Sequence, residues 1–380
     1  ILSEPEASGS LPHISNLASS LQTESEAEIY SRLARSAYAP GKRHRMLNLQ
    51  THGTHMLDLA AGADPFDITD PVRDVELLGV QLRPSSYDVT SGRGITLDLE
   101  RWLLFLWIAA YLIGADRLLV NISLGITAGP KDGTSDAEGI IRDAINLAAA
   151  FGLEMEVFLP FGNSYHDQLA AELSPRPGHD QAIQWQIQPD DLTAGYFEIQ
   201  QNGSDTFDLN TLVLTVTAPD GTSMIIAAPA GGVISDDIVV QGVLCGHVSF
   251  VPKNANGRKA HIVVAFGPSR ANPEAALSGP KPCPAGRWTM SIASPDDPVE
   301  LTLQMQRDDR PAGSASGARQ AYFEGPNTRE FDRDARQHTG LGASGPVVYR
   351  GTNSAFSQVD HANVKTVGGA LVRSQQTLGQ

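Results

Sequence analysis

The sequence predicts an α/β fold with a parallel sheet, interrupted by a β-sandwich insertion. Strand-like and helix-like segments alternate between residues 75 and 161, which is typical of parallel strands joined by crossover helices. From about residue 183 the period changes, and short strands follow one another between turn residues, which favours an antiparallel sandwich. A chain of 380 residues is long enough for both units.

The first unit is expected to hold three strands and two helices. Apolar and β-branched residues predict strands at 75–82, 117–124 and 155–161. Residues 98–113 are mostly apolar and predict a buried helix, because their apolar run is shorter than the ~20 residues that a membrane-spanning helix needs. Residues 135–151 repeat apolar side chains at i, i+3 and i+4, which predicts a helix that ends at Gly152.

The second unit is expected to consist of short strands. They are predicted at 182–188, 211–217, 238–244, 261–266 and 288–293. Residues 307–346 lack a period and are rich in Arg, Asp, Gly, Ala and Ser, so they are interpreted as an exposed connection. Residues 364–372 are again strand-like and are expected to rejoin the first sheet.

The composition excludes some partners. Lys and Arg number 28 against 43 Asp and Glu, a net charge of −15, so nucleic acid is not an expected partner. Cys245 and Cys283 permit at most one disulfide and leave the compartment open. No basic-then-apolar signal pattern follows Ile1. We expect a soluble protein without a membrane span, for which the cytoplasm is one compatible compartment; its oligomeric state stays open.

The most specific motif is His52-Gly-Thr-His55, at the start of an expected helix within residues 51–62. Two histidines near a helix start are commonly ordinary polar residues. His52, His55 and Asp58 are also spaced i, i+3 and i+6, which keeps a metal site as an alternative.

Two further motifs follow predicted strands. The segment ending in Ser123-Leu124-Gly125 can pair with an extended peptide, main chain to main chain, although it also fits a core strand with a flexible loop. Asn163 follows the next strand, and its neutral amide can donate a hydrogen bond to a developing oxyanion. The other interpretation of a Gly-Asn pair is a turn.

Taken together, these motifs resemble those of the subtilisin-like serine proteases, or subtilases, in a branch with a β-rich insertion. The resemblance implies a parallel sheet with helices on both faces, and a serine endopeptidase that acts on polypeptides through an acyl-enzyme without a cofactor or metal. It implies His52 as general base, Asn163 as oxyanion donor, and Ser123, Leu124 and Gly125 as the substrate strand. Lys131 stands where that branch usually has His.

The resemblance implies three domain segments. Residues 1–178 form the first part of the subtilisin-like α/β domain, residues 179–307 the β-sandwich insertion, and residues 308–380 a flexible connection that returns to the sheet without a nucleophile segment.

The chain departs from the family in its triad, which subtilases order Asp, His, Ser. The first Asp is Asp58, after His52. Ser223 imitates the nucleophile motif, but the turn residues before it predict a hairpin strand. Ser354 lies in a segment that matches a family motif preceding the nucleophile.

Because a base without a nucleophile performs no acyl transfer, we expect this chain alone to be inactive. It is either truncated at both ends or degenerate. The hypotheses are a serine endopeptidase, a pseudoprotease that binds polypeptide segments, and a metal-dependent hydrolase.

Overall fold

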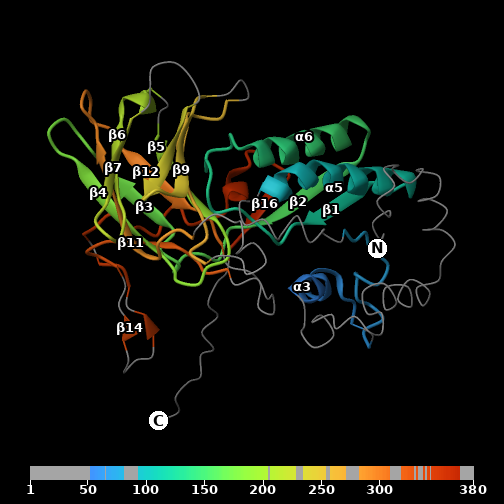
Figure 1. Cartoon of the computed structure of the whole chain (residues 1–380). Helices are drawn as coiled ribbons and strands as arrows, with labels where there is room; N and C mark the ends of the chain where they lie inside the picture. Colours follow the sequence, from blue (N-terminus) through green and yellow to red (C-terminus); the bar gives the residue numbers. More distant parts are fainter. Residues whose placement is uncertain are drawn as a thin grey trace, which may run out of the picture.

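The computed structural model places a small helical part beside a larger β-sandwich (Figure 1). The structure describes residues 52–64, 66–80, 93–203, 206–227, 234–253, 257–270, 282–308, 318–328, 331–332, 337–338, 340–342 and 344–368. Among the helices of these residues, none has the length and apolar character needed to cross a membrane.

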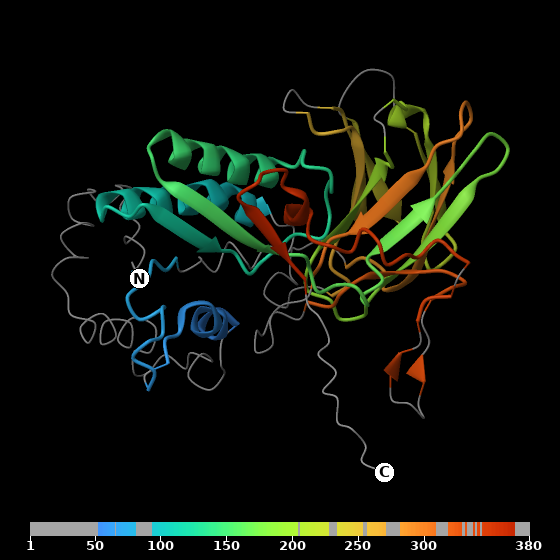
Figure 2. The same cartoon turned by 180° about the vertical axis from the view of Figure 1, so that it is seen from behind.

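The small part is built on a parallel sheet of three strands, in the order β1 (Arg117–Asn121), β2 (Glu154–Pro160) and β16 (Val364–Val367). Helices α5 (Arg93–Leu112) and α6 (Asp136–Ala150) contact each other, β1 and β2, and lie over the same face of this sheet (Figure 2). The predicted helices, the second and third predicted strands and the return of the chain to the sheet are therefore confirmed.

Local chemistry explains why α6 begins and ends where it does. Ser135 Oγ accepts a hydrogen bond from Glu138 N, and the Glu138 carboxylate accepts one from Ser135 N, which is a capping box. Gly152 follows the helix with a φ of 80°, a left-handed conformation that favours glycine. Between these ends, Ile141 and Ile145 are fully buried in the core of the small part.

The larger part consists of two antiparallel sheets. Their strand orders are β3-β12-β5-β10-β9-β8 and β13-β4-β11-β6-β7. The strands are β3 (Ala170–Leu173), β4 (Gln181–Ile187), β5 (Gly195–Gln201), β6 (Val213–Thr217), β7 (Ser223–Ala227), β8 (Ile234–Val240), β9 (Val243–Val251), β10 (His261–Phe266), β11 (Gly286–Ala293), β12 (Leu301–Met305) and β13 (Tyr322–Glu324). The remaining short elements are η2 (Leu209–Thr211), η4 (Ala355–Gln358), β14 (Phe331–Asp332) and β15 (Gln337–His338).

Aromatic side chains fill the space between the two sheets. Trp185 on β4 stacks on Trp288 of β11 at 5.8 Å, and its ring also meets the edge of Phe197 from the other sheet at 5.4 Å. Phe323 on β13 packs against Phe197 at 5.3 Å. Burial of these large apolar side chains holds the sandwich together.

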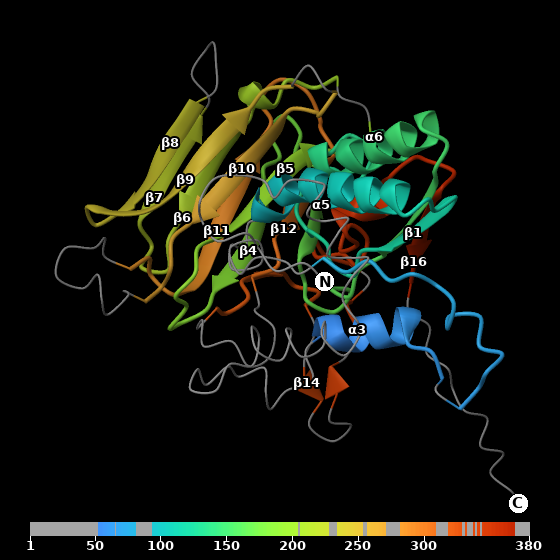
Figure 3. The ribbon, with the colours of Figure 1, turned by 90° about the vertical axis from the view of Figure 1, so that its right-hand side faces the viewer.

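The expected fold class is wrong. The structure is dominated by antiparallel strands, and the parallel sheet has only three strands among the described residues, with α5 and α6 on one face. Helix α3 (His52–Ala61) lies apart from this sheet, and its Leu57 and Leu59 are exposed (Figure 3). The α/β alternation of the sequence extends over too short a stretch to decide the architecture of the whole chain.

Three segments differ from their predictions. Residues 75–80 are not a strand, because an apolar run without a neighbouring strand has no hydrogen-bonding partner; residues 81–82 lie outside the described residues. The predicted strand 238–244 is divided by a turn at Gln241 and Gly242, both with positive φ. Within 307–346, β13 joins a sheet and buries Phe323, so this part is not an exposed connection.

The domain boundaries after residues 178 and 307 stay a prediction. The sandwich sheets contain β3, which precedes residue 179, and β13, which follows residue 307.

Candidate functional site

The segments that follow β1 and β2 lie side by side at the carboxyl ends of the parallel strands, where α/β sheets commonly place their sites. A third segment bridges them. Ser354 N donates to Phe161 O at 2.7 Å, and Ala355 N donates to Ile126 O at 2.7 Å. The predicted substrate strand and the predicted oxyanion residue are therefore held at one edge.

Two glycines make this close approach possible. A Cβ atom on Gly125 would lie 2.4 Å from Ser354 Oγ, closer than real contacts allow. Gly162 has a φ of +131°, and a Cβ there would lie 3.1 Å from Ser354 N. Both positions need glycine because of the bridge formed by Ser354.

The main chain of Leu124 and Gly125 is open to a partner. Within the described part of the chain, no hydrogen bond engages the backbone N–H or C=O groups of these two residues. Among the described residues β1 is an edge strand, and Gly125 is exposed. Such a segment is able to add an extended peptide as a further strand.

Asn163 is exposed and is oriented by Arg307. The Asn163 side-chain oxygen accepts a hydrogen bond from the Arg307 guanidinium, which leaves the amide NH₂ group as the donor toward a ligand. The backbone N of Arg307 donates to Thr127 Oγ1 at 2.6 Å. Arg307 therefore contacts both loops of the site from the end of β12.

The sandwich also supports the loop that follows Gly125. Gln306 Oε1 accepts hydrogen bonds from Thr127 N at 3.1 Å and from Ala128 N at 3.0 Å, and Gln306 and Thr127 are buried. The ion pair of Lys259 with Asp132, at 2.7 Å, adds a second link. Gln306 and Arg307 were missed by the sequence analysis because they begin a stretch without a periodic pattern or motif.

The structure does not place the predicted base. His52 is the first residue of α3, but the side chains of His52 and His55 lie outside the described residues. The roles of His52 as base and of His52, His55 and Asp58 as metal ligands stay hypotheses. Within the described residues, no group of three His, Cys, Asp or Glu side chains is arranged to hold a metal ion.

Neither serine that imitates a nucleophile is available for that role. Ser223 is the first residue of β7 and its hydroxyl lies 2.8 Å from that of Thr217 in the paired strand β6, as the turn before it predicts. Ser354 is 3% exposed, and its Oγ caps η4 by accepting from Phe356 N.

Lys131 lies between the site loop and the sandwich. Its ammonium donates to Thr127 O and to Gln304 Oε1, the latter at 3.4 Å. Burial of the ammonium lowers the pKa of Lys131 to about 7, against the opposing effect of the Glu198 and Glu138 carboxylates.

The lowered pKa of Lys131 predicts a pH-dependent stability. The folded state releases the proton near pH 7, whereas the unfolded chain keeps it up to about pH 10.5, so the free energy of unfolding should rise with pH between these values. Chemical denaturation at several pH values between 7 and 9 should show this rise. Lys131→Met should make the profile flatter than that of the unchanged protein; parallel profiles would contradict the assignment.

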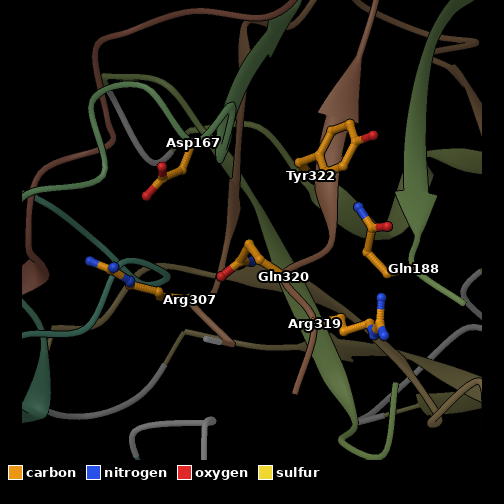
Figure 4. A pocket seen from close by; sticks show the side chains of 6 residues that line it. All are labelled: Asp167, Gln188, Arg307, Arg319, Gln320 and Tyr322. Atoms are coloured by element: carbon orange, nitrogen blue, oxygen red, sulfur yellow. The ribbon is translucent and has the colours of Figure 1, made fainter. Parts of the chain in front are cut away.

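A cavity of about 390 Å³ is lined in part by Arg307, the residue that bonds to Asn163. Figure 4 shows Asp167 and Arg307 on one side of it, Gln188, Arg319 and Tyr322 on the other, and Gln320 between them. Each of these lining residues carries a polar or charged group, and the cavity shares Arg307 with the site described above.

Comparison with known proteins finds no matching family model and no matching curated protein. Two solved structures are similar in part. The Clostridium perfringens CspB protease is 14% identical with a TM-score of 0.43, over 60% of this chain and 41% of that one. The Bacillus licheniformis lipase BlEst2 in its propeptide form is 9% identical with a TM-score of 0.19, over 37% of this chain and 22% of that one. This chain thus spans less than half the length of either structure.

Proposed function

We propose that this chain carries part of the catalytic machinery of a subtilisin-like serine endopeptidase and engages an extended polypeptide. Residues Ser123, Leu124 and Gly125 form its substrate strand, Asn163 is the oxyanion donor, and His52 is the general base. The proposal rests on the motifs that carry the family resemblance.

The observation that carries the proposal is the main chain of Leu124 and Gly125, which makes no hydrogen bond within the described residues, at the same end of the parallel sheet as the segment of Asn163. An amide donor in a fixed orientation stabilises the negative charge that develops on a carbonyl oxygen during acyl transfer. Arg307 supplies the fixed orientation by holding the other end of the same amide.

Acyl transfer also needs a nucleophile and a base within hydrogen-bond reach of each other. Ser223 is part of a hairpin and Ser354 is a buried cap. These placements favour the second candidate function, a pseudoprotease that binds a polypeptide segment without cutting it.

The test is peptide binding, measured by the fluorescence anisotropy of a labelled extended peptide with the full 380-residue chain. We expect saturable binding, weakened roughly tenfold when alternate peptide nitrogens are methylated, because each methyl group removes a main-chain hydrogen bond worth about 1 kcal/mol. Equal binding of both peptides would exclude strand addition. Failure to bind any peptide would refute both candidate functions.

A quenched fluorescent peptide then separates the two candidates. Binding without cleavage supports the pseudoprotease. Cleavage that is lost in His52→Ala would show an active peptidase and would overturn the expectation that this chain is inactive.

A further inference from the structure

The cavity lined by Arg307 and Arg319 differs in charge from the chain as a whole. The whole chain carries −15, whereas the charged residues lining the cavity are two arginines and one aspartate. Figure 4 shows Asp167 and Arg307 on one side of the cavity and Arg319 on the other. Burial raises the pKa of the Asp191 carboxylate overall, whereas the Arg319 charge favours the ionised form of this carboxylate and so acts to lower that pKa. A volume of about 390 Å³ lies in the range of small-ligand sites.

Most of the other polar groups around the cavity are already engaged within the protein. The Gln320 amide donates to Gln306 O at 3.2 Å and to Ala321 O at 2.8 Å, and its oxygen accepts from Asp308 N. Gln320 therefore forms a fixed wall between the two arginines. The Tyr322 phenol lies close to the Gln188 side chain and to the Glu324 carboxylate, and its burial raises the pKa of Tyr322.

Arg319 is positioned by its backbone. Its N–H donates to Asp191 Oδ1 at 3.2 Å, and the same oxygen accepts from the backbone N and the hydroxyl of Thr193. This buried carboxylate anchors the main chain of Arg319 at the wall of the cavity, while the Arg319 residue itself is exposed. A planar guanidinium presents paired donors that match the two oxygens of a carboxylate.

Arg307 connects the cavity with the proposed peptide site, because its guanidinium lines the cavity and bonds to Asn163. We infer that the cavity binds a carboxylate of the polypeptide that pairs with residues 123–125, with Arg319 as the group that determines the preference for it. This inference rests on the proposed function and adds a substrate class to it, namely polypeptides with an acidic group near the paired segment.

The experiment measures anisotropy with four labelled versions of one extended peptide and the full chain. The first version carries Glu, which is placed at each position of the peptide in turn, and the second carries Gln at the same position. The third version has a free C-terminus, and the fourth has an amidated C-terminus. We expect a carboxylate-bearing peptide to bind about tenfold more tightly than its neutral counterpart. The pair that shows the difference identifies the source as an internal side chain or a chain terminus.

Variants assign the preference to the cavity. Arg319→Gln should remove the tenfold difference between the acidic and the neutral peptide, whereas Arg319→Lys should keep only part of it. Arg101→Gln on α5, whose side chain is 73% exposed, is the matched control for loss of one positive charge and should retain the preference. Thermal melting of each variant checks that it is folded.

Two results would overturn the inference in distinguishable ways. If acidic and neutral peptides bind equally to the unchanged protein, or if Arg319→Gln keeps the preference, the cavity is not a carboxylate site, although the proposed function stands. If no peptide binds, the proposed function fails and this inference fails with it.

Discussion

Replacing Gly125 by alanine is expected to weaken peptide binding by at least about tenfold and to destabilise the protein by about 2 kcal/mol. The added Cβ would lie 2.4 Å from Ser354 Oγ and 2.9 Å from Ser354 Cβ. Because Ser354 is buried and its backbone bridges to Phe161, the chain at residue 125 must move instead. Such a movement displaces the segment on which a peptide would pair.

The effect of Gly125→Ala is measured by peptide anisotropy and by urea denaturation. Gly139→Ala in α6 is the matched control, because a Cβ there meets only Arg142 Nη2 at 3.7 Å and alanine favours a helix. The control should bind peptide normally and be at least as stable as the unchanged protein. Normal binding by Gly125→Ala would show that residues 123–125 are not the peptide site.

Replacing Glu198 by glutamine is expected to lower the free energy of unfolding by about 3 kcal/mol. The Glu198 side chain is 7% exposed and pairs with Arg258 at 3.1 and 3.3 Å, while Gln200 Nε2 donates to it at 3.0 Å. Its negative charge also favours the protonated form of Lys131. Loss of this charge removes the carboxylate that the Arg258 guanidinium contacts in a mostly buried place.

Two further variants test the explanation for Glu198. Glu324→Gln removes the partner of Arg287, whose side chain is 60% exposed, and should cost less than about 1 kcal/mol because solvent screens that pair. The double variant Glu198→Gln, Arg258→Met should be more stable than Glu198→Gln alone, because it also removes the guanidinium that faces the lost carboxylate. If the double variant is less stable than the single one, the charge of Arg258 is not the cause.

The buried polar groups around Glu198 also matter for the candidate site. Lys131 and Gln306 both bond to Thr127, which begins the loop after the predicted substrate strand. The sandwich therefore supports the loop through polar contacts as well as through packing. We expect changes in β5 and β12 to alter peptide binding even though these strands are far from the site in the sequence.

Much of the local structure follows from the sequence, because its causes are local. The apolar spacing of α6 and its capping box lie within residues 135–151, and the alternation of β4 and β11 is visible in each strand alone. The turn before Ser223 likewise predicts that this residue starts a hairpin strand. These are the elements for which pattern and structure agree.

Other features depend on which segments become neighbours, and no local pattern contains that information. The apolar residues 75–80 resemble a strand, yet a strand forms only where another strand pairs with it. The resemblance implied helices on both faces of a parallel sheet, whereas the sheets are mainly antiparallel and α5 and α6 share one face. The difference arises because most strands belong to the antiparallel sandwich and only three belong to the parallel sheet of the described residues.

The sequence by itself determined that Gly125 and Asn163 each follow an apolar strand, because the strand period ends at the residues before them. Only the tertiary structure decided that Ser354 bridges the two segments and that Arg307 orients Asn163. The physical reason is that hydrogen bonds such as that of Arg307 to Asn163 join residues 144 positions apart. Such contacts form only after the sandwich has packed against the parallel sheet, and therefore leave no periodic signal along the chain.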